Sequence, residues 1–253
     1  MPAGAPVDYT DRRFNQTTDR YAAEDLETIE VARRYGDHVF RLFQPHVGHR
    51  VLEVGCGIGT MSRRLAEVSD VIVGIEPNAA CIERVRAAMR DEPKFSLRPC
   101  HLEECDPRDL ATYEFDTVYC VNVLEHIEDD VEALRLFRDA LVPEGRVLIF
   151  VPAVQAAYGP LDAELGHHRR YSGAQLSAAF LEAGLEPLSM RYTNPIGLLG
   201  WFYNKYVTKA RVHSVGQMKL FERLVAPWAL PLERLIPPPI GSSLVAIGRK
   251  TTT

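Results

Sequence analysis

Short apolar runs alternate with helical stretches through the middle of this 253-residue chain, and this rhythm constrains its fold more than any other feature. Buried strands that alternate with amphipathic helices are typical of βαβ units and of a parallel sheet covered on both faces. The expected strands are residues 50–54, 71–75, 95–98, 115–121 and 146–151, and the expected helices between them are 60–68, 78–90 and 129–141. A tight turn at 143–145 leads into the fifth strand. We therefore predict an α/β, Rossmann-like sheet with helices on both faces.

The two ends of the chain extend this core differently. Apolar spacing predicts a helix over residues 24–43, which Pro45 ends. After a polar loop at 152–172, a helix is expected at 173–183, with Ser172 as its N-cap. Strands at 185–192 and 243–249 bring the total to seven, and they enclose a basic, aromatic segment that we expect to be an α-helical insert.

Composition narrows the class of protein. With 46% hydrophobic and 25% charged residues the chain is an ordinary globular protein. Five cysteines without a CxxC pair predict neither a disulfide framework nor a zinc site, which favours a reducing, cytoplasmic setting. We find no apolar leader and no stretch of ~18 apolar residues that could span a bilayer. A net charge of -5 argues against nucleic acid as a partner.

The charge is unevenly distributed along the sequence. From residue 191 onward there are nine lysines and arginines against two acidic residues, although the whole chain is acidic. This asymmetry is either a chance feature of a solvated face or a sign that the C-terminal part faces an anionic substrate group or surface.

The strongest motif is a glycine-rich turn after the first strand. Gly55 and Gly57 permit positive φ angles and a close approach of the backbone to a ligand. Glu76, at the end of the second strand, can accept hydrogen bonds from both hydroxyls of a ribose. Thr60 stands where a dinucleotide fingerprint needs a third glycine or alanine, which disfavours an NAD(P)-dependent oxidoreductase, the first alternative.

Four segments, taken in order, resemble the class I S-adenosylmethionine-dependent methyltransferases: 53–59, 73–78, 115–127 and 144–149. The resemblance covers about residues 30 to 192 and implies S-adenosylmethionine as the cofactor. It also implies a sheet order of 3-2-1-4-5-7-6 with the seventh strand antiparallel. We accordingly divide the chain into a lead-in with a cofactor-covering helix (1–45), a cofactor-binding core (46–192), a helical insert that caps the site (193–241) and a last strand with its tail (242–253).

The same resemblance assigns cofactor contacts. It implies that Glu53 lies near the methionine end, that Glu76 holds the ribose and that residues 100–103 bracket the adenine. The N-terminal helix would add Arg20, Tyr21 and Tyr35, although Tyr35 could equally be a core residue. The full expected set is Glu53, Gly55, Cys56, Gly57, Glu76, Pro77, His101, Leu102, Asn122, Val123 and Tyr35.

The acceptor site is predicted from groups that follow strands four and five. A sulfonium is already a good leaving group, so a base is needed only when the nucleophile carries a proton. His126 follows the fourth strand, and its ordinary pKa of ~6.5 suits proton abstraction, although a structural role is an alternative. In the loop after strand five we expect His167 to be the base and Asp162 its partner. The alternative for this loop is a salt-bridged surface. The other candidates are Tyr171 for catalysis and Tyr158, Arg170 and Trp201 for substrate binding.

No metal is expected. Residues 122–126 resemble a stretch of quinone-biosynthesis O-methyltransferases in which Glu-x-x-Glu-His holds a divalent ion. Here Asn122 replaces the first glutamate, and the loss of one carboxylate weakens a site for a hard cation.

The loop pattern and the motifs at 194–202 and 237–241 resemble a bacterial branch of methyltransferases that tailors surface glycans, lipids or secondary metabolites. We therefore expect O-methylation of a small, sugar- or lipid-linked acceptor, either neutral or anionic, with deprotonation by a histidine. The basic insert could form a lid, a homodimer face or a contact with an anionic membrane. A second alternative is a non-catalytic partner that keeps the fold.

Overall fold

A computed structural model describes residues 31–209 and 215–252 of the chain. The first part of the helix expected at 24–43, together with Arg20 and Tyr21, lies outside these residues. Within them, the N-terminal helix is α2 (Arg33–Phe43), followed by the short turn η1 (Gln44–His46).

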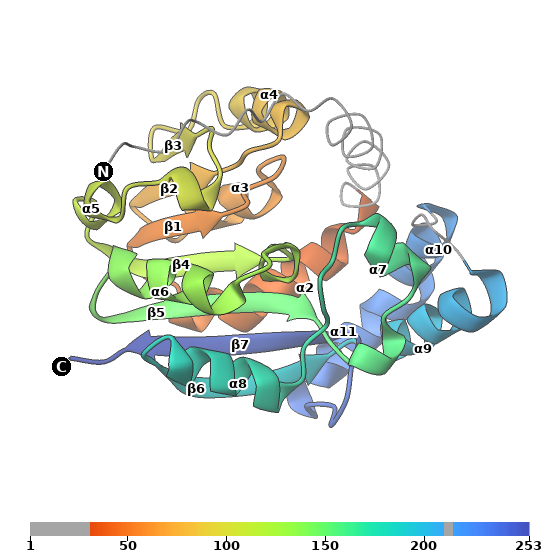
Figure 1. Cartoon of the computed structure of the whole chain (residues 1–253). Helices are drawn as coiled ribbons and strands as arrows, with labels where there is room; N and C mark the ends of the chain where they lie inside the picture. The colour runs from red at the N-terminus through yellow and green to blue at the C-terminus, as the bar shows by residue number, and fades with distance from the viewer. Residues whose placement is uncertain (1–30, 210–214, 253) are drawn as a thin grey trace.

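A single seven-stranded sheet forms the centre of the molecule (Figure 1), and its strand order is β3-β2-β1-β4-β5-β7-β6. Strands β1 to β5 are parallel, whereas β7 runs antiparallel to both β5 and β6. The predicted fold class, strand order and antiparallel last strand are therefore confirmed. The strands are β1 (Arg50–Val54), β2 (Val71–Ile75), β3 (Phe95–Arg98), β4 (Phe115–Val121), β5 (Leu141–Pro152), β6 (Leu185–Thr193) and β7 (Ser243–Lys250).

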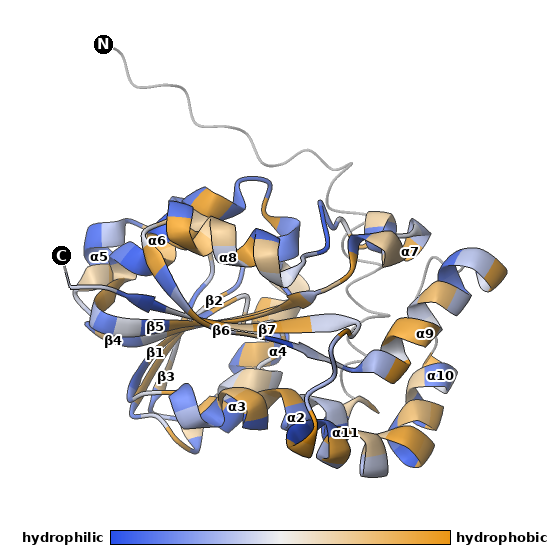
Figure 2. Cartoon of the chain, turned by 90° about the horizontal axis from the view of Figure 1, so that it is seen from below, coloured by the Kyte–Doolittle hydropathy of each residue, from blue (hydrophilic) through white to orange (hydrophobic). Residues whose placement is uncertain are grey.

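Helices cover both faces of the sheet (Figure 2). One face carries α2, α3 (Thr60–Ala66) and α4 (Ala79–Ala88); the other carries α5 (Pro107–Ala111), α6 (Asp130–Ala140) and α8 (Gly173–Glu182). Alternate residues of a strand point to opposite faces, so Val51 packs in the core beneath α2 while Leu52 packs in the core beneath α6. Since both residues are fully buried, β1 is apolar on both sides, as a central parallel strand must be.

Strand β5 begins earlier than the sequence suggests, at Leu141. The turn expected at 143–145 is present as a bulge inside the strand. Glu144 has a φ of 65°, and the pairing of β5 with β4 shifts register between Phe115 and Thr117. Such a bulge bends the strand without ending it.

The loop after β5 contains two helical turns that the sequence analysis did not predict, η4 (Gln155–Ala157) and α7 (Pro160–Glu164). Pro160 occupies the first turn of α7, where a missing amide hydrogen costs nothing. Two backbone hydrogen bonds join the two ends of the loop. The amide of Val154 donates to the carbonyl of Tyr171, and the amide of Tyr171 donates to the carbonyl of Pro152. The loop then leads to α8, whose N-cap is Ser172 as predicted.

The segment between β6 and β7 is helical, as expected. Asn194, which has a φ of 59°, caps its first helix by accepting from the amide of Gly197 at 2.8 Å. The insert comprises α9 (Pro195–Tyr203), the π-helical turn η5 (Asn204–Thr208), α10 (Val215–Leu220), a second π-helical turn η6 (Phe221–Val225) and α11 (Ala226–Leu235). Among the described residues, no helix has both the length and the apolar character needed to cross a membrane.

Candidate active site

The glycine-rich turn lies between β1 and α3, at the carboxyl ends of the parallel strands. The amides of Gly55 and Cys56 both donate to the carbonyl of Ile75, at 2.9 and 3.0 Å, which anchors the turn on β2. Gly55 and Gly57 have φ angles of 71° and 55°. A Cβ atom at Gly55 would lie 2.3 Å from Cγ2 of Val123, whereas one at Gly57 would meet no described atom within 4 Å. The turn is therefore tightly packed at Gly55 and open at Gly57.

Glu76 lies beside this open surface. Its carboxylate accepts from the amide of Gly57 at 2.8 Å and from the amide of Asn78 at 2.9 Å, one bond to each oxygen. An ionised carboxylate offers about four acceptor positions, so about two remain for a ligand. Burial raises the pKa of Glu76 despite these two bonds. Pro77, next in the chain, is exposed, and Asn78 caps α4.

Glu53, at the end of β1, is a second buried carboxylate near the turn. Ser62 donates to it at 2.5 Å. Burial raises the pKa of Glu53 to about 8, against the effect of the Ser62 bond, and the neighbouring Glu76 raises it further. Two carboxylates at one turn favour a ligand with positive charge. The Cys56 side chain is buried in the core, so only the backbone of Cys56 is available to a ligand at the turn.

The other predicted cofactor residues follow β3 and β4. Asn122 takes a φ of 54° directly after β4, and its amide donates to the carbonyl of Phe150 at 2.8 Å. Val123 then packs against Gly55. His101 is exposed and precedes the turn η2 (Leu102–Glu104), whose Leu102 is buried in the same core as Val54 and Ile75.

Tyr35 is placed differently from the rest of the set. Its ring makes edge contacts with Phe150 and Phe221, and its hydroxyl lies 3.4 Å from Oγ of Ser243. These contacts tie α2 to the insert and to β7, so the cofactor role of Tyr35 stays a prediction and its alternative as a core residue gains support.

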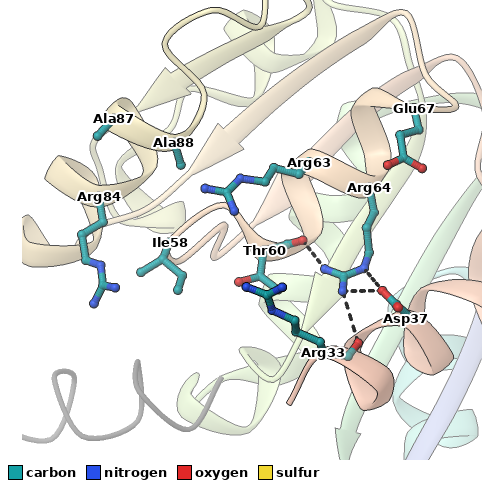
Figure 3. Close-up of a pocket in the computed structure, with 10 residues that line it drawn as sticks. All are labelled: Arg33, Asp37, Ile58, Thr60, Arg63, Arg64, Glu67, Arg84, Ala87 and Ala88. Carbon is teal, nitrogen blue, oxygen red and sulfur yellow. Dashed lines mark hydrogen bonds and ion pairs between the residues drawn. The ribbon is translucent and has the colours of Figure 1, made fainter. Parts of the chain in front are cut away.

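A hollow of about 930 Å³ lies between α2, α3 and α4 (Figure 3). Arg64 forms an ion pair with Asp37 at 2.6 Å on its wall. Ile58 and Thr60 of the glycine-rich segment line this hollow, whereas Gly57 and Glu76 do not. Its lining residues are Arg33, Asp37, Ile58, Thr60, Arg63, Arg64, Glu67, Arg84, Ala87 and Ala88.

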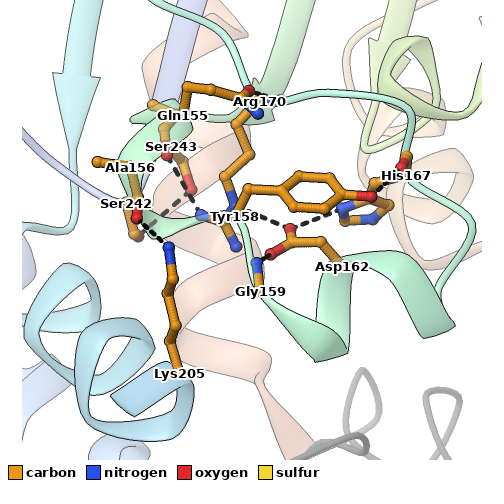
Figure 4. A network of polar contacts seen from close by, with 11 residues as sticks. Gln155, Ala156, Tyr158, Gly159, Asp162, His167, Arg170, Lys205, Ser242 and Ser243 are labelled. Atoms are coloured by element: carbon orange, nitrogen blue, oxygen red, sulfur yellow. Dashed lines mark hydrogen bonds and ion pairs between the residues drawn. The ribbon is translucent and has the colours of Figure 1, made fainter. Parts of the chain in front are cut away.

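In the loop after β5, the polar side chains form one connected network (Figure 4). Asp162, which is fully buried, bonds His167 Nδ1 at 2.9 Å through Oδ1 and accepts from Arg170 Nε at 2.8 Å through the same oxygen. The amide of Gly159 donates to the other oxygen at 2.9 Å. Burial alone would raise the pKa of Asp162, but the bonds from His167 and Arg170 outweigh it and lower that pKa. The predicted partnership of Asp162 with His167 is therefore present in the geometry.

The candidate substrate residues of this loop are engaged with one another. Arg170 is 1% exposed, and its guanidinium lies 3.9 Å from the centre of the Trp201 ring. Tyr158 donates to the carbonyl of His167 at 2.7 Å. These contacts position Asp162 and His167, and they leave the roles of Tyr158, Arg170 and Trp201 in substrate binding as predictions. The alternative of a salt-bridged surface loop does not fit, since the central Asp162–Arg170 pair is buried.

Tyr171 is 3% exposed, and its hydroxyl donates to Asp130 at 2.8 Å. This bond fixes the end of the loop on α6. Its predicted catalytic role receives no support from its contacts and remains a prediction.

Glu125 is a site residue to which the sequence analysis assigned no role. It lies in the short turn η3 (Leu124–His126) after β4, is 1% exposed, and neither carboxylate oxygen has a hydrogen-bond partner among the described residues. Burial raises the pKa of Glu125 to about 8. The adjacent His126 brings its ring to 4.7 Å from that of His167. The signal in the sequence was the resemblance of residues 122–126 to a Glu-x-x-Glu-His stretch, in which Glu125 and His126 match the last two residues.

The family to which the chain belongs follows from one comparison. A family described as "Methyltransferase domain" matches residues 23–190. The chain belongs to this methyltransferase family. The expected class, an S-adenosylmethionine-dependent methyltransferase, and the expected cofactor are thereby confirmed, and the oxidoreductase alternative is disfavoured.

Individual relatives share parts of this methyltransferase. A tRNA U34 carboxymethyltransferase from Haemophilus influenzae (strain PittEE) is 32% identical over 117 residues, which cover 45% of this chain and 35% of the relative. A ubiquinone biosynthesis O-methyltransferase from Histophilus somni (strain 2336) is 31% identical over 104 residues, 40% of this chain and 43% of the relative. The chain thus matches less than half the length of either relative.

The fold recurs among solved structures. The N-methyltransferase NodS from Bradyrhizobium japonicum, solved with S-adenosylhomocysteine, superposes with a TM-score of 0.61 at 16% identity, covering 94% of this chain and 98% of NodS. At this identity the likeness concerns the fold.

One expectation is corrected by these relatives. The sequence analysis excluded nucleic acid as a partner, and this exclusion is wrong, because several of the relatives are named for a tRNA nucleotide. The physical error was to argue from net charge. Phosphate recognition depends on local basic surface, and a net charge of -5 averages over an acidic first part and a basic last part of this chain.

Proposed function

We propose that this methyltransferase transfers the methyl group of S-adenosylmethionine to an oxygen atom of an acceptor that enters over the carboxyl ends of β4 and β5. The donor would lie beside Gly57, with its ribose on Glu76 and its positive charge near Glu53. The acceptor hydroxyl would meet His167, whose Nδ1 is held by Asp162 so that Nε2 is free to take a proton. The acceptor is a small, sugar-linked or lipid-linked alcohol.

The observation that carries this proposal is the buried Asp162–His167 bond of 2.9 Å. A histidine whose first nitrogen is fixed by a carboxylate presents the second in one orientation, as a general base requires. An oxygen nucleophile needs such a base when it is protonated at the working pH, whereas a sulfide or an unprotonated amine does not.

The test is transfer of a radiolabelled methyl group by the full chain to a panel of alcohols that includes sugar- and lipid-linked ones, with tRNA as a separate arm. The names of the relatives make the tRNA arm necessary. Transfer to an alcohol supports the proposal. Transfer to tRNA alone would overturn the acceptor class and keep the methyltransferase activity. S-adenosylhomocysteine binding without transfer to any arm would favour the non-catalytic alternative.

His167→Ala tests the base within the same assay. Loss of a general base lowers the rate by about 100- to 10,000-fold, while affinity for S-adenosylhomocysteine should hardly change. The matched control is His168→Ala, since His168 is the exposed neighbour. Full activity of His167→Ala would remove His167 from the mechanism.

A further inference from the structure

We propose that Glu125, His126 and His167 form a binding site for one divalent transition-metal ion, with Asp162 orienting His167 from behind. The proposal departs from the sequence expectation of no metal, because His167 reaches the cluster from a loop that the sequence separates from Glu125. The chemistry attributed to the ion rests on the proposed function; the binding of the ion does not.

The three residues offer their ligand atoms within a small space. One atom from each, a carboxylate oxygen of Glu125 and a ring nitrogen of each histidine, lies within 4.8 Å of the others. The two segments that carry them are joined directly, because the amide of His168 donates to the carbonyl of Glu125 at 2.8 Å. The rings of His126 and His167 meet edge to face at 4.7 Å. The backbone therefore holds the donors together before any ion binds.

Glu125 is the residue that most needs a cation. It is 1% exposed, and among the described residues both of its carboxylate oxygens are without a hydrogen-bond partner. An unpartnered buried carboxylate is costly, and proteins normally pair it or use it to coordinate a metal. The nearby Arg170 offers its positive charge but no hydrogen bond to Glu125. Its Nε bonds Asp162 and its Nη1 bonds the carbonyl of Ala153, while its Nη2, like the Glu125 oxygens, has no hydrogen-bond partner among the described residues.

His167 is hydrogen-bonded to a carboxylate through one ring nitrogen, as metal-binding histidines commonly are. Its Nδ1 is bonded to Asp162 at 2.9 Å, and Asp162 is fixed in turn by Arg170 and by the amide of Gly159. A carboxylate on one ring nitrogen sets the tautomer and points the other nitrogen at the ion. This second layer is built from buried side chains, as a preorganised site requires.

The donor set indicates the class of ion. Two imidazoles and one carboxylate suit zinc and its first-row neighbours, and three protein ligands leave a coordination position open. Magnesium and calcium prefer oxygen ligands, which fits this cluster less well.

An open position beside the methyl donor would serve the proposed transfer. If the ion held the acceptor hydroxyl, it would favour loss of the hydroxyl proton to solvent. The oxygen would then form a bond to the methyl carbon, and the electron pair of the broken carbon–sulfur bond would remain on sulfur as S-adenosylhomocysteine. With the ion in place His167 is a ligand, and the ion takes over the activation that the ring would otherwise provide as a base.

The test is zinc binding to the untagged full chain after chelator treatment, followed by calorimetry, with cobalt as a spectroscopic substitute. We expect one equivalent per chain, and ligand-field bands of low coordination number with cobalt. Glu125→Gln and His167→Ala should abolish the saturable binding, and Asp162→Asn should weaken it by about 10- to 100-fold. His168→Ala and His49→Ala, both at exposed histidines, should bind zinc like the wild type.

Binding of S-adenosylhomocysteine by each variant confirms that it is folded. Less than one equivalent of zinc on the wild type, or unchanged zinc affinity in both ligand variants, would overturn the metal site. If zinc fails to bind while methyl transfer still depends on His167, the metal proposal falls and the proposed function stands.

Discussion

At the scale of single residues, Glu76 supports the sharpest prediction about the cofactor. Glu76→Gln would put an amide NH₂ group where the carboxylate now accepts from the backbone, so one of the bonds from Gly57 and Asn78 must be lost. A ribose hydroxyl would lose a charged acceptor as well. Since bonds to a charged group contribute about 1.5–3 kcal/mol, affinity for S-adenosylhomocysteine should fall by about 10- to 100-fold in calorimetry.

Glu83→Gln is the matched control for that substitution, because Glu83 is an exposed residue of α4 in an ion pair with Arg86. Equal affinity in Glu76→Gln and Glu83→Gln would remove Glu76 from the cofactor site.

Single residues also differ in how far their roles could be predicted from the sequence. Glu76 was predictable, because its role depends on its place after a strand next to a glycine turn. Glu125 was predictable only as part of a stretch that resembles a metal-binding one. Its burial without a hydrogen-bond partner was not predictable, because that is a property of the packing around it. Arg170 shows the same limit. Its residue type suggested substrate binding, which stays a prediction, whereas its contact with Trp201 and its bond to Asp162 depend on how distant segments pack.

At the scale of elements, the β1–α3 turn separates two glycines that look equivalent in the sequence. Both Gly55→Ala and Gly57→Ala incur about 1–2 kcal/mol for a left-handed backbone. Gly55→Ala also forces a Cβ to 2.3 Å from Val123, so it should cost about 1–3 kcal/mol more in urea unfolding. Gly57→Ala should stay folded yet lose cofactor affinity, because its new methyl group fills the open surface beside Glu76.

The free energy of unfolding thus reports on Gly55, and the affinity for S-adenosylhomocysteine reports on Gly57. Wild-type affinity for S-adenosylhomocysteine in Gly57→Ala would show that the cofactor does not use this surface. Equal stability of the two variants would contradict the packing of Gly55 on Val123.

Most elements of the core were predictable because a parallel sheet imposes a repeated pattern of burial, and strands β1 to β4 begin and end where the apolar runs do. The elements that were missed are short ones whose form depends on distant contacts. Helix α7 exists because Asp162 points into a buried network, and the early start of β5 depends on pairing with Phe115. Neither contact leaves a periodic signal in the sequence.

At the scale of the whole molecule, the insert clasps the N-terminal helix α2 through buried polar groups. Glu222 of η6 accepts from the amides of Arg34 and Tyr35, both at 2.9 Å. Further along α2, His38 lies 3.3 Å from Thr193 Oγ1, and Thr193 donates to Glu233 of α11 at 2.7 Å. Segments from the two ends of the described chain are therefore held together beside the sheet, which makes their contact sensitive to the charge on His38.

That contact should weaken in acid. His38 is 4% exposed, and burial, followed by the positive charges of Arg191, Arg234 and Arg41, lowers its pKa to about 4. Glu233, at 3.8 Å, favours the charged ring but is outweighed. The unfolded chain binds this proton more readily than the folded chain does. The contribution of the neutral ring to the free energy of unfolding is therefore fully present above the ordinary pKa of ~6.5. It declines as the pH falls toward the pKa of the folded chain, and roughly 2–3 kcal/mol are lost near pH 4.5.

The measurement is the free energy of urea unfolding for wild type and His38→Gln at about pH 7.5 and about pH 4.5. Glutamine keeps a polar side chain of similar reach but does not titrate, so the variant should be the less stable protein at the higher pH and should lose roughly 2–3 kcal/mol less on acidification. Comparing the two proteins cancels the titration of every other group, including the remaining histidines. If both lose the same stability, His38 has the same pKa in the folded and unfolded chains, and burial does not keep the ring neutral. If the wild type loses less than His38→Gln, the folded ring is protonated and pairs with Glu233.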